Sequence, residues 1–213
     1  ILTLVIAIPL GVIAGANPQT KLSKGIMAGS IFGISLPSFW MGMMLIYVFS
    51  VSLQILPASG RAAAGPGGFS FLTPGGWKNL IMPVLTLALG YSATILRVTR
   101  AGIQENMKQD YVKFARAKGV SRRNVLFHHA LKNALVPVVT VFGLNIGHMF
   151  AFTTVTETIF AWPGVGKLLI DSILRNDRPI IVAYLILVSA MFVVINFVVD
   201  IIYMLVDPRI ELR

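Results

Sequence analysis

The chain has 213 residues, of which 56% are hydrophobic and only 12% are charged. A soluble domain usually carries about 25% charged residues. This composition therefore excludes an ordinary soluble globular protein, a disordered chain and a collagen-like chain. The absence of cysteine excludes disulfides, thiolate metal sites and a Cys nucleophile. The net charge of +10 raises the question of nucleic acid binding, which the distribution of the basic residues answers.

Long stretches without charge indicate membrane-spanning helices. A helix needs about 20 mostly apolar residues to cross about 30 Å of hydrocarbon. The runs are continuously apolar and do not alternate, which excludes a barrel. Pro37 lies inside the second run and should kink it. The sequence predicts an all-α polytopic membrane protein with five transmembrane helices, near residues 1–16, 26–54, 79–103, 134–156 and 180–206.

The basic residues are distributed unequally over the loops between these helices. Thirteen of the 18 Lys and Arg residues fall on one side and five on the other. The positive-inside rule places the first side, with the C-terminus, in the cytoplasm. Topology thus explains the charge, and we expect the lipid bilayer as a partner and no nucleic acid. The chain is expected to be a single transmembrane domain, 1–213, with outer loops at about 55–78 and 157–180.

The sequence begins within an apolar run. Five spans and a cytoplasmic C-terminus would put Ile1 outside, and Ile1 is not a start residue. The first segment has neither a basic region nor a cleavage-like site, so it does not match a signal peptide. We therefore expect an N-terminally truncated chain, with one preceding helix that would bring the number of spans to six.

Residues 104–133 form the only long polar stretch on the predicted cytoplasmic side. Asp110 is expected to cap a short helix over 111–118, which Gly119 should end. Ser121 is expected to cap a second helix that leads into the next span.

The short helix should carry an aromatic face. Spacings of three and four residues place Tyr111, Phe114 and Ala115 together, with cations around them. Such a helix suits docking into a groove on a partner protein. The alternative is an amphipathic helix that lies on anionic lipid.

This stretch resembles the cytoplasmic "EAA" loop of ABC importer permeases, and most closely that of the dipeptide/oligopeptide (peptide/nickel) branch. The matching segments are DYVKFARAKGVS at 110–121 and HALKNALVP at 129–137, together with GISLPSFW at 33–40, LPASG at 56–60, ETIFAWPGVG at 157–166 and DPR at 207–209. The resemblance covers essentially the whole chain. It departs from the general loop pattern where Glu-Ala-Ala is replaced by Lys113-Phe114-Ala115, so no role of a Glu at that position is expected.

The resemblance implies a six-helix permease subunit of an ATP-driven importer in a bacterial or archaeal inner membrane, and not an enzyme. The implied partners are a second homologous permease, two ATPase subunits that use ATP and Mg, and an extracytoplasmic binding protein that delivers peptides. The sequence has no P-loop, so we expect no cofactor on this chain. The residues implied in ATPase coupling are Asp110, Tyr111, Phe114, Ala115, Arg116, Ala117, Gly119 and Ser121.

Mildly polar side chains inside the predicted spans form a candidate translocation path. Weak polarity suits a bulky solute that is recognised elsewhere, and it equally suits hydrogen bonds between helices. These residues are Ser35, Ser38, Asn145, Thr153 and Thr154.

Asp200 is the one carboxylate inside a predicted span. A charge within the membrane is costly and often functional. Asp200 either pairs with a basic or interfacial group near the inner end of its helix, or takes part in proton transfer or coupling.

The outer segment 157–180 should contain a short helix over 167–174. This helix either receives the binding protein or gates the outer mouth, or it is scaffold. The three histidines have no carboxylate at ligand spacing, so we expect no metal site.

Other functions are compatible with parts of this pattern. The same architecture could import nickel, glutathione or oligosaccharides. A secondary transporter driven by an ion gradient would need intramembrane acids and inverted repeats. A membrane-embedded enzyme would need catalytic pairs at matching depth. The sequence shows neither the acids and repeats of a secondary transporter nor the catalytic pairs of a membrane enzyme convincingly. The loop over 111–119 distinguishes an ABC importer from these two classes.

Overall fold

The computed structural model describes residues 1–62, 70 and 73–206, and these residues contain helices and no strand. The described residues belong to two compact units. Unit 1 comprises Ile1–Ser35, Tyr91–Asn145 and Ile195–Arg213, and unit 2 comprises Leu36–Gly90 and Ile146–Val194. Three long helices contribute to both units: α4 (Pro74–Asn106), α7 (Lys132–Ile159) and α9 (Arg178–Val206).

The length and composition of the helices confirm an all-α polytopic membrane protein, although with fewer complete spans than predicted. Within the described residues, three helical stretches can cross a membrane: Gly75–Asn106, Arg122–Met149 and Arg178–Val199. They correspond to the predicted spans at 79–103, 134–156 and 180–206. The predicted span at 1–16 is α1 (Leu2–Ala16), whose 15 residues extend only about 22 Å.

The prediction of one continuous helix over 26–54 is wrong. The helix α2 (Lys21–Ser35) ends before Pro37, and the chain continues as α3 (Ser38–Leu45) and the π-helix η1 (Ile46–Ser52). Proline lacks an N–H and keeps the residue before it out of the helical conformation, so Pro37 breaks the helix instead of kinking it. The two parts count as a fourth span only when they are taken together.

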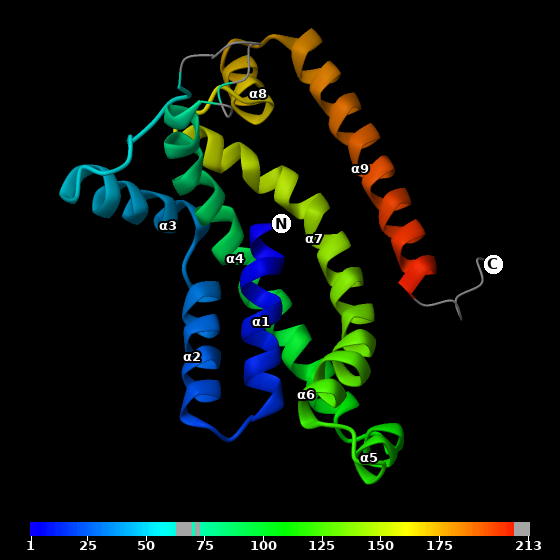
Figure 1. Cartoon of the computed structure of the whole chain (residues 1–213). Coiled ribbons are helices and arrows are strands. Elements are labelled where there is room, and N and C mark those ends of the chain that lie inside the picture. Colours follow the sequence, from blue (N-terminus) through cyan, green and yellow to red (C-terminus); the bar gives the residue numbers. More distant parts are fainter. Residues whose placement is uncertain (63–69, 71–72, 207–213) are drawn as a thin grey trace. The chain divides into compact units, whose positions relative to one another are not determined.

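In unit 1, α1 packs closely against the second half of α4, and α2 follows α1 after a short turn (Figure 1). Small residues on α1 permit this approach. A Cβ atom on Gly11 would lie 2.6 Å from the Cβ of Thr99, and one on Gly15 would lie 2.8 Å from the Cβ of Ile103. Glycines four residues apart commonly allow close helix contact in membranes. The adjoining apolar cores contain Ala7, Ile95, Leu96 and Val138, and Val12, Ile103, Ala130 and Ala134.

Unit 2 is built around the turn that follows α7. Phe160 is 2% exposed, and its carbonyl accepts a hydrogen bond from the N–H of Gly60 at 2.8 Å. The short helix α8 (Val165–Leu174) follows this turn (Figure 1). The prediction of a short helix over 167–174 is thus confirmed, with a start two residues earlier.

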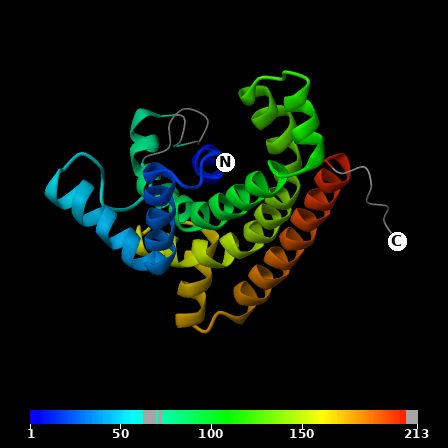
Figure 2. The same ribbon diagram turned by 90° about the horizontal axis from the view of Figure 1, so that it is seen from below.

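In unit 1, the polar stretch between α4 and α7 folds into consecutive short helices, seen in green in Figure 2. They are α5 (Asp110–Ala117), α6 (Arg122–Asn124) and the π-helix η4 (Val125–Leu131), which continues directly into α7. The predicted loop at 104–133 is therefore mostly helical, because α4 extends to Asn106 and the next span begins its helix at Arg122.

Candidate functional site

The helix α5 begins one residue earlier than predicted. Its N-cap is Gln109, without a side-chain hydrogen bond, so the prediction that Asp110 caps the helix is wrong. Asp110 occupies the first turn, where a negative charge is favourable to the helix dipole. Its carboxylate accepts a hydrogen bond from the Nζ of Lys113 at 2.8 Å. This hydrogen bond and the charge of Lys113 lower the pKa of Asp110.

The C-terminus of α5 has the geometry of a Schellman motif. The N–H of Val120 bonds to the carbonyl of Ala115 at 3.1 Å, and the N–H of Gly119 bonds to that of Arg116 at 2.9 Å. Gly119 has a φ of +79°, which favours glycine. The prediction that Gly119 ends the helix is confirmed. So is the cap at Ser121, whose Oγ accepts a hydrogen bond from the N–H of Asn124 at 3.4 Å.

The two faces of α5 differ from the predicted ones. Val112 and Ala115 are 0% and 8% exposed and form a small core with Val125. Phe114 is 62% exposed and Tyr111 is 39% exposed. The predicted aromatic face is therefore right for Phe114 and Tyr111 and wrong for Ala115, because successive residues of a helix are about 100° apart. Arg116 and Ala117 are exposed.

We call residues 104–133 the coupling segment. Within it, the hydroxyl of Tyr111 connects α5 to the long helices on either side, α4 and α7. It donates a hydrogen bond to the Oδ1 of Asn106 at 2.6 Å and accepts one from the Nδ2 of Asn133 at 2.9 Å. Asn106 ends α4 and Asn133 lies at the start of α7. Sequence reasoning missed both asparagines as functional residues, since neither helix spacing nor composition brings them to Tyr111.

A second connection joins the coupling segment to the end of α1. The guanidinium group of Arg122 donates to the carbonyl of Ala16 at 3.3 Å and to the side-chain carbonyl of Asn17. These residues are more than 100 positions apart, so the sequence contained no local signal for the contact. Together with the Tyr111 hydrogen bonds, it links the coupling segment to α1, α4 and α7.

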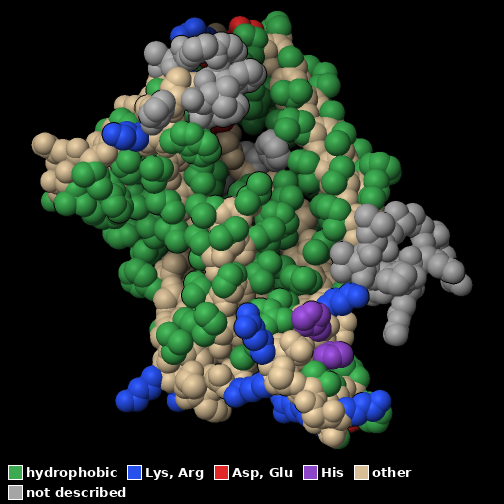
Figure 3. Space-filling view, viewed as in Figure 1, with side chains coloured by type: hydrophobic (Ala, Val, Ile, Leu, Met, Phe, Trp, Pro, Cys, Tyr) green, Lys and Arg blue, Asp and Glu red, His purple; other side chains and the backbone are tan. Residues whose placement is uncertain are grey.

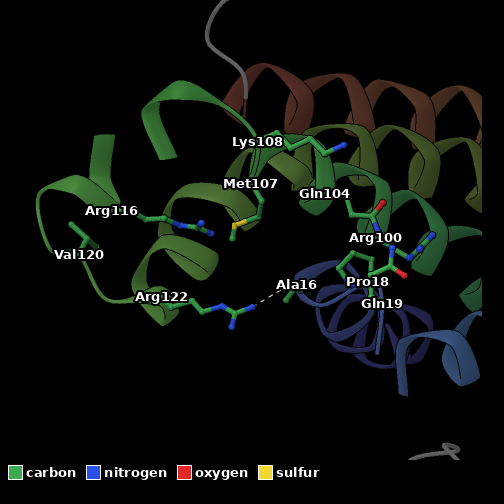
Figure 4. Close-up of a pocket in the computed structure, with 11 residues that line it drawn as sticks. Ala16, Pro18, Gln19, Arg100, Gln104, Met107, Lys108, Arg116, Val120 and Arg122 are labelled. Carbon is green, nitrogen blue, oxygen red and sulfur yellow. Dashed lines mark hydrogen bonds between the residues drawn. The ribbon is translucent and has the colours of Figure 1, made fainter. Parts of the chain in front are cut away.

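The coupling segment is strongly basic. Figure 3 shows Lys and Arg side chains gathered over the α1–α2 turn and over α5 and α6, with histidine side chains beside them. Nearby, a cavity of about 880 Å³ lies between the end of α1, the second half of α4 and the α5–α6 region (Figure 4). Four cations line it: Arg100, Lys108, Arg116 and Arg122.

The residues of the candidate translocation path are divided between the units. Ser35 and Asn145 belong to unit 1, whereas Ser38, Thr153 and Thr154 belong to unit 2. The hydroxyls of Ser35 and Thr153 donate to carbonyls four residues earlier in their own helices, at 2.9 and 2.7 Å. The Nδ2 atom of Asn145 is buried and has no hydrogen-bond partner within the described residues. The translocation path stays a prediction.

In unit 2, Glu157 has a structural role that the sequence pattern did not reveal. Its side chain is almost fully buried, and its Oε2 accepts the backbone N–H of Lys167 at 2.8 Å, in the first turn of α8. The Nζ of Lys167 in turn pairs with Asp171 at 2.8 Å. The carboxylate of Glu157 therefore caps α8 from the end of α7.

Two further predictions concern isolated titratable residues. Asp200 belongs to α9, but its side chain lies outside the described part of the structure. Among the residues that the structure does describe, no three His, Asp or Glu side chains form a group that could hold a metal ion.

The long apolar helices, with a basic segment between two of them, define a multi-pass membrane protein. The fold resembles the structure titled "Inward facing conformations of the MetNI methionine ABC transporter", with a TM-score of 0.74, 97% of this chain and 88% of that chain covered, and 17% identity. Residues 7–212 match the family "Binding-protein-dependent transport system inner membrane component". The chain belongs to this family.

Named relatives agree with the predicted branch of permeases. The chain is 44% identical to the di/tripeptide transport system permease protein DppB of Pseudomonas aeruginosa, with 94% of this chain and 64% of the relative covered. It is 41% identical to the oligopeptide transport system permease protein AppB of Bacillus subtilis, with 99% and 66% covered. It is 39% identical to the glutathione transport system permease protein GsiC of Escherichia coli, with 95% and 62% covered. The chain spans just under two thirds of the length of these relatives.

Proposed function

We propose that the chain is the permease subunit of an ATP-driven importer of peptides in a bacterial or archaeal inner membrane, with its C-terminus in the cytoplasm. It forms half of the translocation path, and a second homologous permease forms the other half. Two ATPase subunits, which use ATP and Mg, dock on the coupling segment. An extracytoplasmic binding protein delivers the peptide. The peptide-transport names of relatives at 41% and 44% identity support this substrate class.

The observation that carries the proposal is that α5 buries one face in the core and exposes an aromatic side chain on another. Phe114 projects from the helix and is 62% exposed, while Val112 and Ala115 hold the opposite face in the core. An exposed aromatic side chain on a helix fixed in this way suits a cleft on a partner protein.

The hydrogen bonds of Tyr111 give the docked helix a route to the spans. When the ATPase pair closes on ATP, its movement displaces α5, and Tyr111 passes the displacement to Asn106 of α4 and Asn133 of α7. ATP on one side and the loaded binding protein on the other then shift the equilibrium between inward-open and outward-open states.

The test is peptide uptake by the complete importer in proteoliposomes, with ATP inside and the loaded binding protein outside. Phe114→Ala should lower peptide uptake several-fold and weaken the retention of the ATPase. Phe197→Ala is the matched control, because Phe197 lies on α9 and is 64% exposed. Unchanged uptake and ATPase retention in Phe114→Ala, and in a second variant Phe114→Asp, would show that α5 does not dock the ATPase.

Glutathione is a second candidate solute, because a glutathione permease is 39% identical to the chain. The two solutes are distinguished by calorimetry on the co-purified binding protein with a di- or tripeptide series and with glutathione. Binding of α-linked peptides would support a peptide importer. Binding of glutathione alone would mean that glutathione is the solute.

A further inference from the structure

The cavity beside the coupling segment is distinctive in its charge. Four cationic side chains line it, and none of the described residues that line it is Asp or Glu. In Figure 4, Arg116 and Arg122 extend toward the cavity from the α5–α6 side, with Arg100 and Gln19 across from them. Like charges in a concave site repel one another and raise the local concentration of anions. This arrangement favours occupation by a negatively charged ligand.

Arg100 provides an independent sign of a missing partner. It lies on α4 and is half-buried, and its Nε–H is buried without an acceptor in the described part of the chain. A buried donor without a partner is destabilising, so such groups generally have a ligand or water. Arg122 differs, because its guanidinium already bonds to the end of α1. Arg100 is therefore the residue of the cavity with the most to gain from an anion.

The shape and setting of the cavity narrow the class of anion. Guanidinium groups bind phosphate oxygens in a paired geometry, and the volume of about 880 Å³ exceeds that of a phosphate alone. The amides of Gln19 and Gln104 line the same space and can bond hydroxyls next to a phosphate. Arg100 also lies only one turn beyond Leu96, in the apolar core that α4 forms with α1. Basic residues at the end of an apolar helix attract anionic headgroups.

We propose that this cavity binds a phosphate-bearing anion, with Arg100 and Arg116 as its main contacts, and that the headgroup of an anionic phospholipid supplies the phosphate. Such a site would serve the permease whichever solute is carried.

The experiment is native mass spectrometry of the full-length permease in its complex, after incubation with defined lipids. The wild type should retain phosphatidylglycerol at least fivefold better than phosphatidylcholine. Arg100→Gln should reduce this preference to about twofold or less. Arg97→Gln is the matched control, because Arg97 lies one turn earlier on α4, is exposed and does not line the cavity. Arg116→Gln is the second test variant, because this exposed residue can be replaced without disturbing a core.

A competition arm identifies the source of the phosphate. If millimolar inorganic phosphate displaces phosphatidylglycerol from the wild type but not residual lipid from Arg100→Gln, the site binds phosphate and accepts a soluble source as well. If phosphate has no effect while the lipid preference depends on Arg100, the headgroup itself is the ligand. Both results support the site.

Two results would overturn the proposal. One is an equal preference for phosphatidylglycerol in the wild type, Arg100→Gln and Arg116→Gln. The other is a loss of ATPase subunits from both variants with lipid binding unchanged, which would assign the cations to an acidic surface of the protein partner instead.

Discussion

The hydroxyl of Tyr111 and the Nδ2 of Asn133 are 2.9 Å apart and form a hydrogen bond between residues 22 positions apart in the chain. The same hydroxyl donates to the Oδ1 of Asn106. A single side chain thus joins the end of α4, the helix α5 and the start of α7. We expect coupling in the proposed importer to depend on this joint, because a loosely attached α5 would move without displacing either long helix.

Removing the Tyr111 hydroxyl should therefore uncouple hydrolysis from transport. In Tyr111→Phe, two hydrogen bonds are lost and the aromatic ring is kept, so the free energy of unfolding should fall by only about 1 kcal/mol. Peptide uptake per ATP hydrolysed should fall several-fold, as measured in proteoliposomes with both rates recorded. Tyr47→Phe is the control, since Tyr47 is an exposed tyrosine outside the coupling segment. A normal ratio of uptake to hydrolysis in Tyr111→Phe would show that the joint is not needed.

The backbone conformation of Gly119 predicts a second effect. A Cβ atom there would meet nothing within 4 Å, so the positive φ alone makes Gly119→Ala unfavourable, by about 1 kcal/mol. Gly29→Ala is the matched control, because Gly29 also has open space around it but has ordinary helical geometry. Thermal unfolding should show a lower Tm for Gly119→Ala only. Equal Tm values for the two variants would contradict the strained conformation.

The contact between α1 and α4 predicts a loss of stability by overpacking. A Cβ atom on Gly11 would lie 2.6 Å from the Cβ of Thr99 and 2.8 Å from the carbonyl oxygen of Leu96. Gly11→Ala should therefore destabilise unit 1 by about 1–3 kcal/mol. The double variant Gly11→Ala/Thr99→Gly should recover part of this loss in a thermal-shift assay on detergent-solubilised protein. Additive effects of the two changes would mean that the helices are not in contact here.

In unit 2, the cap of α8 by Glu157 predicts a local change in hydrogen exchange. Glu157→Ala removes the acceptor for the Lys167 N–H and should increase hydrogen exchange in the first turn of α8, with a cost of about 1 kcal/mol. Glu157→Gln keeps an acceptor oxygen and should show a smaller increase. If exchange at Val165–Lys167 is the same in both variants and in the wild type, the carboxylate does not cap the helix.

The ion pair of α5 predicts a dependence on pH. Lys113 lowers the pKa of Asp110 in the folded protein, so the pair stabilises α5 above the unfolded-state pKa and stops doing so as pH falls through the lowered folded-state pKa. Lys113→Gln should raise the pKa of Asp110 toward its ordinary value, and 0.5 M salt should do so partly, because both groups are exposed. Carboxyl NMR titration measures the change. An Asp110 pKa that Lys113→Gln leaves unaltered would contradict the pair.

The sequence predicted the features that depend on local chemistry. The helical class follows from the length of the apolar runs. The end of α5 at Gly119 and the disruption at Pro37 follow from backbone preference, and the start of the next helix after Ser121 follows from capping. Boundaries moved by one or a few residues because several neighbouring residues can serve as a first turn, as at Asp110. The sequence predicts a kink at Pro37, whereas the helix ends at Ser35 and restarts at Ser38. The break is complete because the missing N–H and the clash of the proline ring act on the same turn.

The contacts between distant segments were not predictable in the same way. Glu157 and Lys167, Tyr111 and Asn133, and Arg122 and Ala16 meet only after helices pack. One signal was readable beforehand: Gly11 and Gly15 are separated by three residues, the spacing that permits close helix contact. The buried face of α5 was assigned wrongly at Ala115, because a short helix with apolar residues on several sides has no unique face by spacing alone.

The wide turns of η4 set the rotational phase of the chain between α6 and α7. A π-helix holds roughly one residue more per turn than an α-helix, and η4 spans Val125–Leu131. Deleting one residue from η4 would leave a regular helix of nearly the same apolarity, yet it would rotate α7 by about 100° relative to α5. Asn133 would then face away from Tyr111. Ala134 and Val138 would also turn out of the apolar cores that they form with α1 and α4. The length of η4 therefore sets the register both of the Tyr111 hydrogen bonds and of the core, and a single-residue deletion there should impair folding as well as transport.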